Sequence, residues 1–174
     1  MKIDYTKMRG KLILGILITF LFAQNAFGQG NNGSTIKVQF TNGYWLVDFL
    51  SDNVSGMESL KKVNAKFDSS EMGIEGVEKA YRSYLKKSFS LDIDTSAINL
   101  KFVSAEINSA MANAQFISAR FKEIGKRVVI KSTAYSKLPD HPVKLVVMVG
   151  DEKYVSWLSE ENGFQYQVDL SAED

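Results

Sequence analysis

Apolar and polar residues alternate on both sides of Asn42-Gly43, and this pattern restricts the fold more than any other part of the chain. Asn-Gly is the strongest two-residue signal for a β-hairpin. A loop at these two residues places three apolar pairs opposite each other, namely Phe40 with Trp45, Val38 with Val47 and Ile36 with Phe49. All three pairs share one face, and a shift by one residue would turn them to the other face. The sequence therefore predicts a hairpin with one buried face.

The second half of the chain is typical of antiparallel strands joined by short turns. Six segments alternate or are continuously apolar: 99–108, 114–122, 127–133, 143–149, 154–158 and 164–170. Val143–Val149 is apolar on both faces, which predicts a central strand covered on both sides. A turn at Asn162-Gly163 predicts a last hairpin in which Trp157 faces Val168 and Val155 faces Leu170. Both tryptophans are therefore expected in the core.

The middle of the chain has helical periodicity. One side of the expected helix carries a stripe of apolar and aromatic residues, namely Ile74, Val77, Tyr81, Tyr84 and Leu85, and residues 68–70 offer caps. Residues 57–67 fit either a short helix or an edge strand, and we favour the strand. These patterns predict a β-dominated α+β fold, with sandwich-like antiparallel sheets and one main amphipathic helix packed on a sheet.

The first 28 residues are typical of an export signal. Four basic residues and one acidic residue precede the apolar run 12–23, which is shorter than the roughly 20 residues that span a bilayer. The run is followed by the small-x-small sequence Ala26-Phe27-Gly28, so we expect cleavage before Gln29. An uncleaved membrane anchor is the alternative. We interpret residues 1–28 as a signal peptide, 29–34 as a flexible linker and 35–174 as a single globular domain.

Composition excludes several kinds of chemistry. The chain has no Cys and one His, which excludes disulfide frameworks, thiol catalysis and zinc sites built from Cys and His. Cleavage would leave 17 basic and 19 acidic residues, a net charge of −2 that disfavours nucleic-acid binding. We expect no metal, no cofactor and no membrane-spanning segment after the signal.

Asp140 and His141 lie between two prolines and form the one polar pair that suggests catalysis. A general base beside an acid would suit hydrolysis, but a turn bounded by prolines explains the same residues. The basic helix face, formed by Lys79, Arg82, Lys86 and Lys87, could meet an anionic lipid or glycan, although such a face is usually only solvated.

The cleavage region also carries the one likeness that the chain offers. Gln29 directly after Ala26-Phe27-Gly28 resembles exported proteins of Bacteroidetes. The likeness covers about the first 30 residues and implies an exported bacterial protein, in the periplasm or at the cell exterior. It implies nothing about activity.

The residue patterns leave three functions open. We expect first a soluble non-enzymatic module of the bacterial envelope, which binds a partner protein or an envelope component through a sheet or a strand edge. The alternative is a periplasmic carrier of a small apolar ligand, held between helix and sheet by Trp45, Tyr81, Tyr84 and Phe102. Hydrolysis at Asp140 and His141 ranks third.

Overall fold

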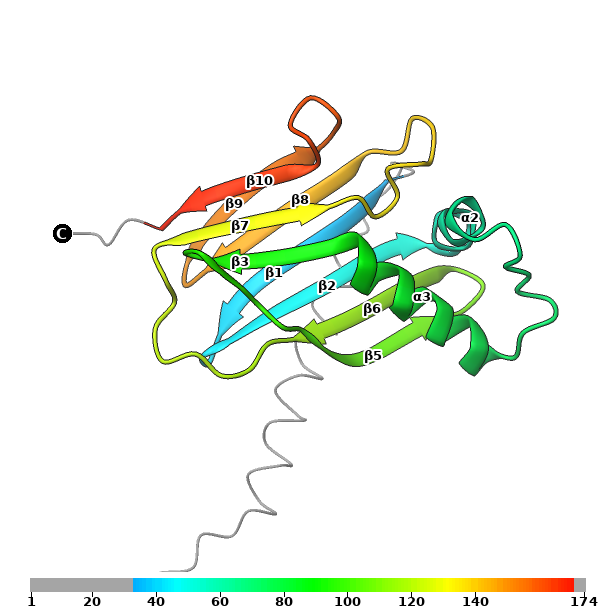
Figure 1. Cartoon of the computed structure of the whole chain (residues 1–174), viewed down its shortest axis with the longest axis horizontal. Helices are drawn as coiled ribbons and strands as arrows, with labels where there is room; N and C mark the ends of the chain where they lie inside the picture. Colours follow the sequence, from blue (N-terminus) through cyan, green and yellow to red (C-terminus); the bar gives the residue numbers. More distant parts are fainter. Residues whose placement is uncertain (1–32, 171–174) are drawn as a thin grey trace, which may run out of the picture. The chain divides into compact units, whose positions relative to one another are not determined.

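Two β-sheets face each other in the computed structural model, which describes residues 33–170 (Figure 1). The larger sheet, sheet A, has six strands in the spatial order β5 (Lys101–Ile107), β6 (Met111–Ile117), β2 (Tyr44–Asp52), β1 (Ser34–Thr41), β8 (Val143–Val149) and β9 (Glu152–Leu158). The smaller sheet, sheet B, has the order β10 (Gln165–Asp169), β7 (Arg127–Ser132), β3 (Phe89–Ile93) and β4 (Ser96–Ala97). Two helices complete the described residues, α2 (Asn53–Val63) and α3 (Ile74–Ser88).

The predicted fold class is confirmed. Strands dominate, the sheets form a sandwich, and α3 is the amphipathic helix that packs on a sheet. Every strand pair is antiparallel except β1 with β8, which run parallel. Sheet A is therefore mixed, a feature that turn signals cannot predict because a parallel pair has no tight turn between its strands.

The amino-terminal hairpin has the predicted register. Phe40 lies opposite Trp45, Val38 opposite Val47 and Ile36 opposite Phe49. Asn42 and Gly43 both have positive φ, 52° and 82°, which is the conformation of a type I′ turn. The turn chemistry and the apolar alternation thus act together to fix which face of β1 and β2 is buried.

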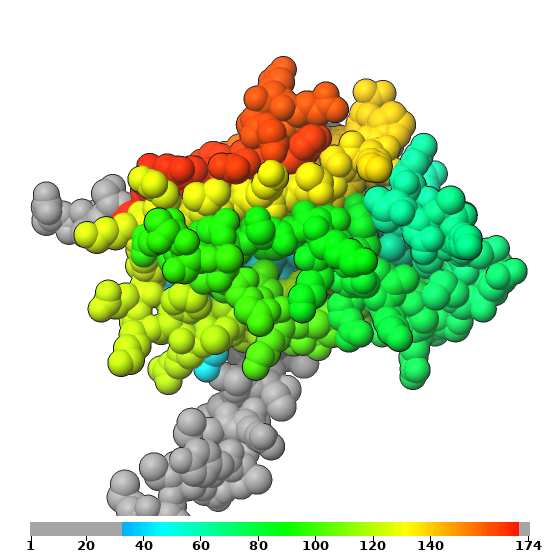
Figure 2. All heavy atoms as spheres, in the orientation of Figure 1, coloured from blue at the N-terminus to red at the C-terminus, as the bar shows by residue number. Residues whose placement is uncertain are grey.

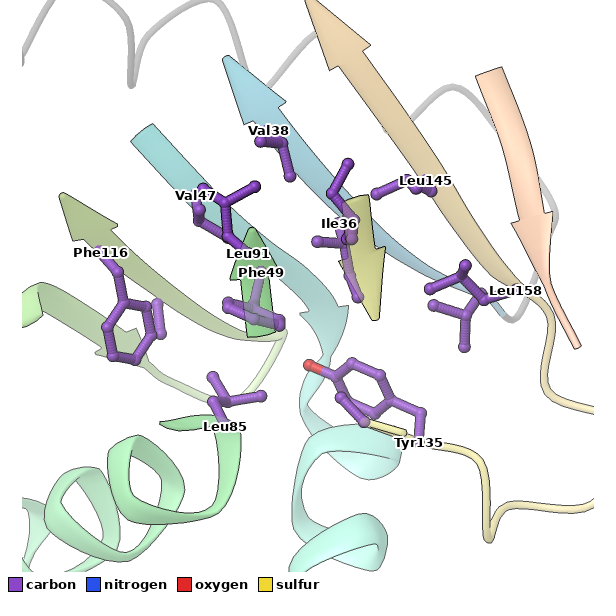
Figure 3. Close-up of a cluster of buried hydrophobic side chains, with 14 of the residues drawn as sticks. Ile36, Val38, Val47, Phe49, Leu85, Leu91, Phe116, Tyr135, Leu145 and Leu158 are labelled. Atoms are coloured by element: carbon purple, nitrogen blue, oxygen red, sulfur yellow. The ribbon is translucent and has the colours of Figure 1, made fainter. Parts of the chain in front are cut away.

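The core lies between the inner face of sheet A and a second layer made of sheet B and the helices. Figure 3 shows Ile36, Val38, Val47 and Phe49 of sheet A pointing toward Leu91 of β3 and Leu85 of α3. Figure 2 shows the second layer from outside, where β3, β7, β10 and α3 cover this side. Both layers contribute to one hydrophobic cluster, so each sheet buries its apolar face against the opposite layer.

Helix α3 carries most of the expected stripe. Val77, Tyr81, Tyr84 and Leu85 are buried, whereas Ile74 at the first position is exposed. The cap expected at residues 68–70 is wrong, because the helix begins after Gly73 and has no side-chain cap bond.

The strand favoured for residues 57–67 is wrong. Residues 53–63 form α2, and Asp52 caps it: the Ser55 backbone N–H donates to Asp52 Oδ1 at 2.8 Å and the Ser55 hydroxyl donates to Oδ2 at 2.6 Å. The cap lies outside the segment that seemed ambiguous. The local signal for a helix was therefore an aspartate at the end of β2, just before the first turn.

The last predicted hairpin is also wrong. β9 pairs with β8 in sheet A and β10 pairs with β7 in sheet B, so Trp157 does not face Val168. The loop between β9 and β10 is held by Asn162, which donates to the Trp157 carbonyl at 2.7 Å and accepts from the Ser159 N–H at 3.0 Å. This loop carries the chain from one sheet to the other instead of returning it along the same sheet.

All six strands expected in the second half form, but several have shifted ends. β6 begins and ends earlier than the expected 114–122, β9 begins two residues before 154, and Phe89–Ile93 is an additional strand. Val143–Val149 has its expected bounds but lies next to the edge strand β9, not at the centre of sheet A.

Residues 1–32 lie outside the described part, and with them the predicted signal peptide and residues 29–32 of the predicted linker. Ser34, expected in the linker, already belongs to β1. Across residues 33–170, neither helix has the length and apolar content that crossing a membrane requires.

The contact between α2 and β6 gives a test of the packing. A Cβ added at Gly56 would lie 2.6 Å from the Cβ of Ala112. We expect Gly56→Ala to lower the free energy of unfolding by about 1–3 kcal/mol through overpacking, and Ala112→Gly to relieve this, so that the two changes couple by about 1 kcal/mol. Urea unfolding of the single and double variants measures the coupling.

The matched control is Gly76→Ala in α3, where the added Cβ would meet only the Met72 side chain at 3.4 Å. This change should stabilise the fold by about 0.5–1 kcal/mol, the usual gain for Gly→Ala inside a helix. Additive effects of the Gly56 and Ala112 changes would contradict the described packing of α2.

Candidate functional site

A cluster of buried tyrosines joins α3 to the sheets. The Tyr81 hydroxyl donates to the Ala112 carbonyl at 2.9 Å, and its oxygen lies 2.5 Å from the Tyr135 hydroxyl and 3.3 Å from Ser51 Oγ. The Tyr84 hydroxyl accepts from the Tyr135 backbone N–H at 2.6 Å. Because the tyrosine hydroxyls are satisfied by each other and by the backbone, the cluster stabilises the fold and offers no obvious group to a ligand.

Electrostatics agree with a structural role for these phenols. Burial raises the pKa of Tyr81 to about 12 and raises the pKa of Tyr135 well above its usual value. Both groups therefore stay neutral at physiological pH and cannot serve as bases there. Tyr81 and Tyr84, predicted as lining residues of an apolar ligand site, lie in this cluster.

The other two predicted lining residues lie elsewhere. Trp45 is fully buried on β2 with its ring centroid 5.1 Å from that of Phe40, and Phe102 lies on β5. Three spaces lie beside α3, of about 100, 420 and 520 Å³. Phe102 lines the two larger ones, whereas Trp45, Tyr81 and Tyr84 line none of the three. The partly open space of about 100 Å³ lies between α3 and sheet A, lined by residues that include Leu85, Phe89 and Phe116. Ligand pockets usually measure about 300–1,000 Å³.

His141 is half-buried and shares a hydrogen bond with Ser34. Its Nε2 lies 2.8 Å from Ser34 Oγ, and its ring centroid lies 5.7 Å from that of Tyr135. Asp140 is exposed with φ at 51°, and its carboxylate makes no side-chain hydrogen bond to the described residues. The structure thus brings His141 to a serine and not to its neighbour Asp140.

A histidine beside a serine hydroxyl has the geometry of a base and a nucleophile. Ser34, however, is 1% exposed, so a substrate could not reach its hydroxyl without moving β1. Burial lowers the pKa of His141, while the nearby carboxylates of Asp52 and Glu58 raise it, and lowering is the net direction. This arrangement favours a neutral imidazole that ties the turn before β8 to the start of β1.

A basic groove lies between α3 and β5. It is an open groove of about 520 Å³ whose lining includes Lys79, Arg82, Lys86, Asn99, Lys101 and Phe102. The Arg82 guanidinium carbon lies 5.0 Å from the centroid of the Phe102 ring, within the range of a cation–π contact. We call these six residues the basic groove.

The basic groove differs from the basic helix face expected from the sequence, because it includes residues of a second element. Lys101 joins it from β5, and Phe102 forms part of its wall. Periodicity on one helix could not predict these two, because pairing with β6 positions the start of β5 beside α3. The signal in the sequence was the basic-apolar pair Lys101-Phe102 following the turn after β3.

β9 is an edge strand of sheet A with exposed apolar side chains. Val155 and Trp157 point away from the core and are 47% and 50% exposed. The expected core position of Trp157 is wrong, because pairing with β8 turns Leu158 and Ser156 to the inner face. Apolar residues on both faces of β9 left its orientation ambiguous in the sequence.

The outward faces of the two sheets differ in chemistry. β10 presents Gln165, Gln167 and Asp169, and the outward face of its neighbour β7 has Lys131 and Arg127. The outward face of sheet A instead carries apolar residues, of which Val155 and Trp157 are about half-exposed, whereas Leu46, Leu50 and Val146 are buried. The exposed apolar area that these residues offer to another molecule is therefore concentrated at Val155 and Trp157, on the β9 edge.

Residues 33–170 contain no group of three His, Asp or Glu side chains placed to hold a metal ion. The chain matches no model of a known protein family and no curated protein sequence. The features of the molecule that bear on its function are therefore the basic groove and the β9 edge.

The Ser34–His141 bond predicts a pH dependence of stability. Because the folded pKa of His141 lies below its unfolded value of about 6.5, the contribution of the neutral imidazole to stability is fully present above about pH 6.5 and is lost as pH falls from there through the folded pKa. His141→Gln can keep a hydrogen bond to Ser34 without titrating. We expect urea unfolding between pH 7.5 and 5 to show wild type losing stability relative to the variant.

A surface change, Lys131→Gln, serves as the control for loss of a polar side chain and should keep the wild-type pH profile. Parallel profiles for wild type and His141→Gln would show that His141 is equally protonated in the folded and unfolded chains.

Proposed function

We propose that the chain is an exported, non-enzymatic module of the bacterial envelope, which binds an extended segment of a partner protein along β9. The observation that carries this proposal is the pair of half-exposed apolar side chains, Val155 and Trp157, on an edge strand. An edge strand offers backbone donors and acceptors to another strand, and neighbouring side chains add specificity.

The backbone of β9 supports strand addition. A two-residue turn at 150–151 joins β8 to β9, so Val149 and Glu152 close the hairpin. In such a hairpin the closing pair is hydrogen-bonded and the pairs then alternate, which directs the N–H and C=O groups of residues 153, 155 and 157 away from β8. The Trp157 carbonyl agrees with this, since it accepts from Asn162 in the loop.

The other edge of sheet A is less suited to strand addition. β5 has an irregular register between Phe102 and Ser104, and α3 contacts it. Bulges and covering helices are common ways in which proteins protect an edge. Among residues 33–170, β9 has no bulge and no covering helix, and Lys153 is the one basic residue at its outward-directed positions.

The alternative of a small-ligand carrier has weaker support. The space between α3 and sheet A, about 100 Å³, is below the usual size of a ligand pocket. Hydrolysis has weaker support as well, because the serine beside His141 is buried. Binding through β9 needs no movement of the core.

Cross-linking in the native host tests the β9 proposal. A photoreactive residue at position 153 should form an adduct with a partner, whereas one at Gln167 on sheet B should not. Val155→Pro should abolish the adduct, because it removes an outward N–H, and proline is tolerated where an edge N–H faces solvent. Mass spectrometry of the adduct identifies the bound segment.

Thermal unfolding provides the matched control. Val155→Pro should unfold within a few degrees of wild type, whereas Ser156→Pro should lose several kcal/mol, on the order of 3, because the Ser156 N–H faces β8. Absence of an adduct at position 153, an equal adduct at Gln167, or an adduct that survives Val155→Pro would each overturn the proposal.

Export predicts the amino terminus of the mature chain. Mass spectrometry of the protein recovered from its host should find Gln29, free or cyclised, as the first residue. Ala26→Arg should block processing, because the peptidase requires a small residue at this position, whereas Phe27→Leu should be processed normally. An intact amino terminus at Met1 in the wild-type protein would contradict export by this signal.

A further inference from the structure

We propose that the basic groove binds a ligand with two or more phosphate groups, held by the cations of α3 and by Lys101 of β5. This site is separate from the β9 edge, since β5 and β9 are the opposite edges of sheet A. The proposal therefore does not depend on partner binding at β9.

The first argument is the arrangement of charge. Lys79, Arg82 and Lys86 follow one another at three and four residues along α3, so they share one side of the helix. Lys101 lines the rim of the same groove from a different element, the edge strand β5, where its cross-strand partner is the outward-facing Ile117. The expected mature chain has a net charge of −2, so four cations around one groove do not follow from an excess of basic residues.

The second argument is that these cations have no ionic partner. Within residues 33–170 the ion pair is between Arg127 and Asp169, on sheet B, and none involves the basic groove. Glu75 and Glu78 line the adjoining groove of about 420 Å³ toward the start of α3, and this groove shares Lys79, Arg82 and Phe102 with the basic groove. Neither carboxylate lies within ion-pair distance of these cations. The positive charge of the groove is therefore available to a ligand.

The third argument separates a ligand site from ordinary helix chemistry. Basic residues in the last turn stabilise the helix dipole, which accounts for Lys86 and Lys87. This effect does not explain Lys79 in the middle of α3 or Lys101 on β5. The Phe102 ring also holds the Arg82 guanidinium at 5.0 Å, which reduces the entropy that arginine would lose on binding.

The spacing of the cations indicates the class of ligand. Lys79 and Lys86 are seven residues apart, which is about 10 Å along a helix at 1.5 Å per residue. A single phosphate can contact only one part of such a row, whereas linked phosphates can contact all of it. Arginine donates to phosphate through two parallel N–H groups, and Asn99 adds a neutral polar side chain.

Calorimetry on the full chain tests the site with inorganic tripolyphosphate and orthophosphate as probes. We expect tripolyphosphate to bind at least 10-fold more tightly than orthophosphate, and the affinity to fall with added salt. Arg82→Gln and Lys101→Gln should each lower the affinity by about 10-fold, since a charge-assisted hydrogen bond contributes about 1.5–3 kcal/mol. Arg82→Lys should recover part of the loss.

Lys131→Gln is the matched control, because Lys131 is an exposed lysine on sheet B. It should bind tripolyphosphate like wild type. Amide chemical shifts should change along α3 and the start of β5 and not along β7. The proposal is overturned if tripolyphosphate does not bind more tightly than orthophosphate, or if Lys131→Gln weakens binding as much as Arg82→Gln.

A second measurement identifies the source of the phosphates. Vesicles that contain a lipid with two phosphates in its headgroup should sediment wild type but not Arg82→Gln if the ligand is a lipid headgroup. Binding of tripolyphosphate without sedimentation assigns the site to a soluble ligand. Either result supports a phosphate site, whereas sedimentation that is unchanged by Arg82→Gln contradicts it.

Discussion

Burial of one face of the β1–β2 hairpin is the constraint on which the rest of the sandwich depends. The type I′ turn at Asn42-Gly43 fixes the register, and the register turns Ile36, Val38, Val47 and Phe49 to the same side. β6 and β8 extend this surface on either side within sheet A, and sheet B and the helices form the layer that covers it. A one-residue slip in the hairpin would expose the surface on which sheet B and α3 pack.

Buried polar groups fix the position of α3 relative to the sheets. Tyr81, Tyr135 and Ser51 connect α3, the segment after β7 and the end of β2, and Tyr81 also reaches the Ala112 carbonyl on β6. Apolar contacts alone tolerate sliding of a helix over a sheet, whereas buried hydroxyls need particular partners. The tyrosines thus set where α3 lies, and through α3 they set the distance between the helix and β5 that defines the basic groove.

Sequence patterns predicted the structural features that depend on residues close together in the chain. They failed to predict which strands pair when the strands are far apart in the sequence. The hairpin register and the stripe of α3 follow from local periodicity; the register is confirmed, and the stripe is confirmed except for Ile74, which is exposed. The assignment of β9 and β10 to different sheets depends on pairing with β8 and β7, which no turn signal encodes. For the same reason the Lys79–Lys86 face was visible in the sequence while Lys101 was not, and Trp157 was placed in the core although it lies outside it.

The parallel pairing of β1 with β8 has a consequence for how the chain folds. Ser34 and His141, which meet at the start of this pair, are separated by 107 positions in the sequence. Long-range contacts of this kind raise contact order and slow folding, because loop closure costs entropy before the contacts form. The hairpin can form early, but the parallel ladder between β1 and β8 cannot be completed until synthesis has passed residue 149.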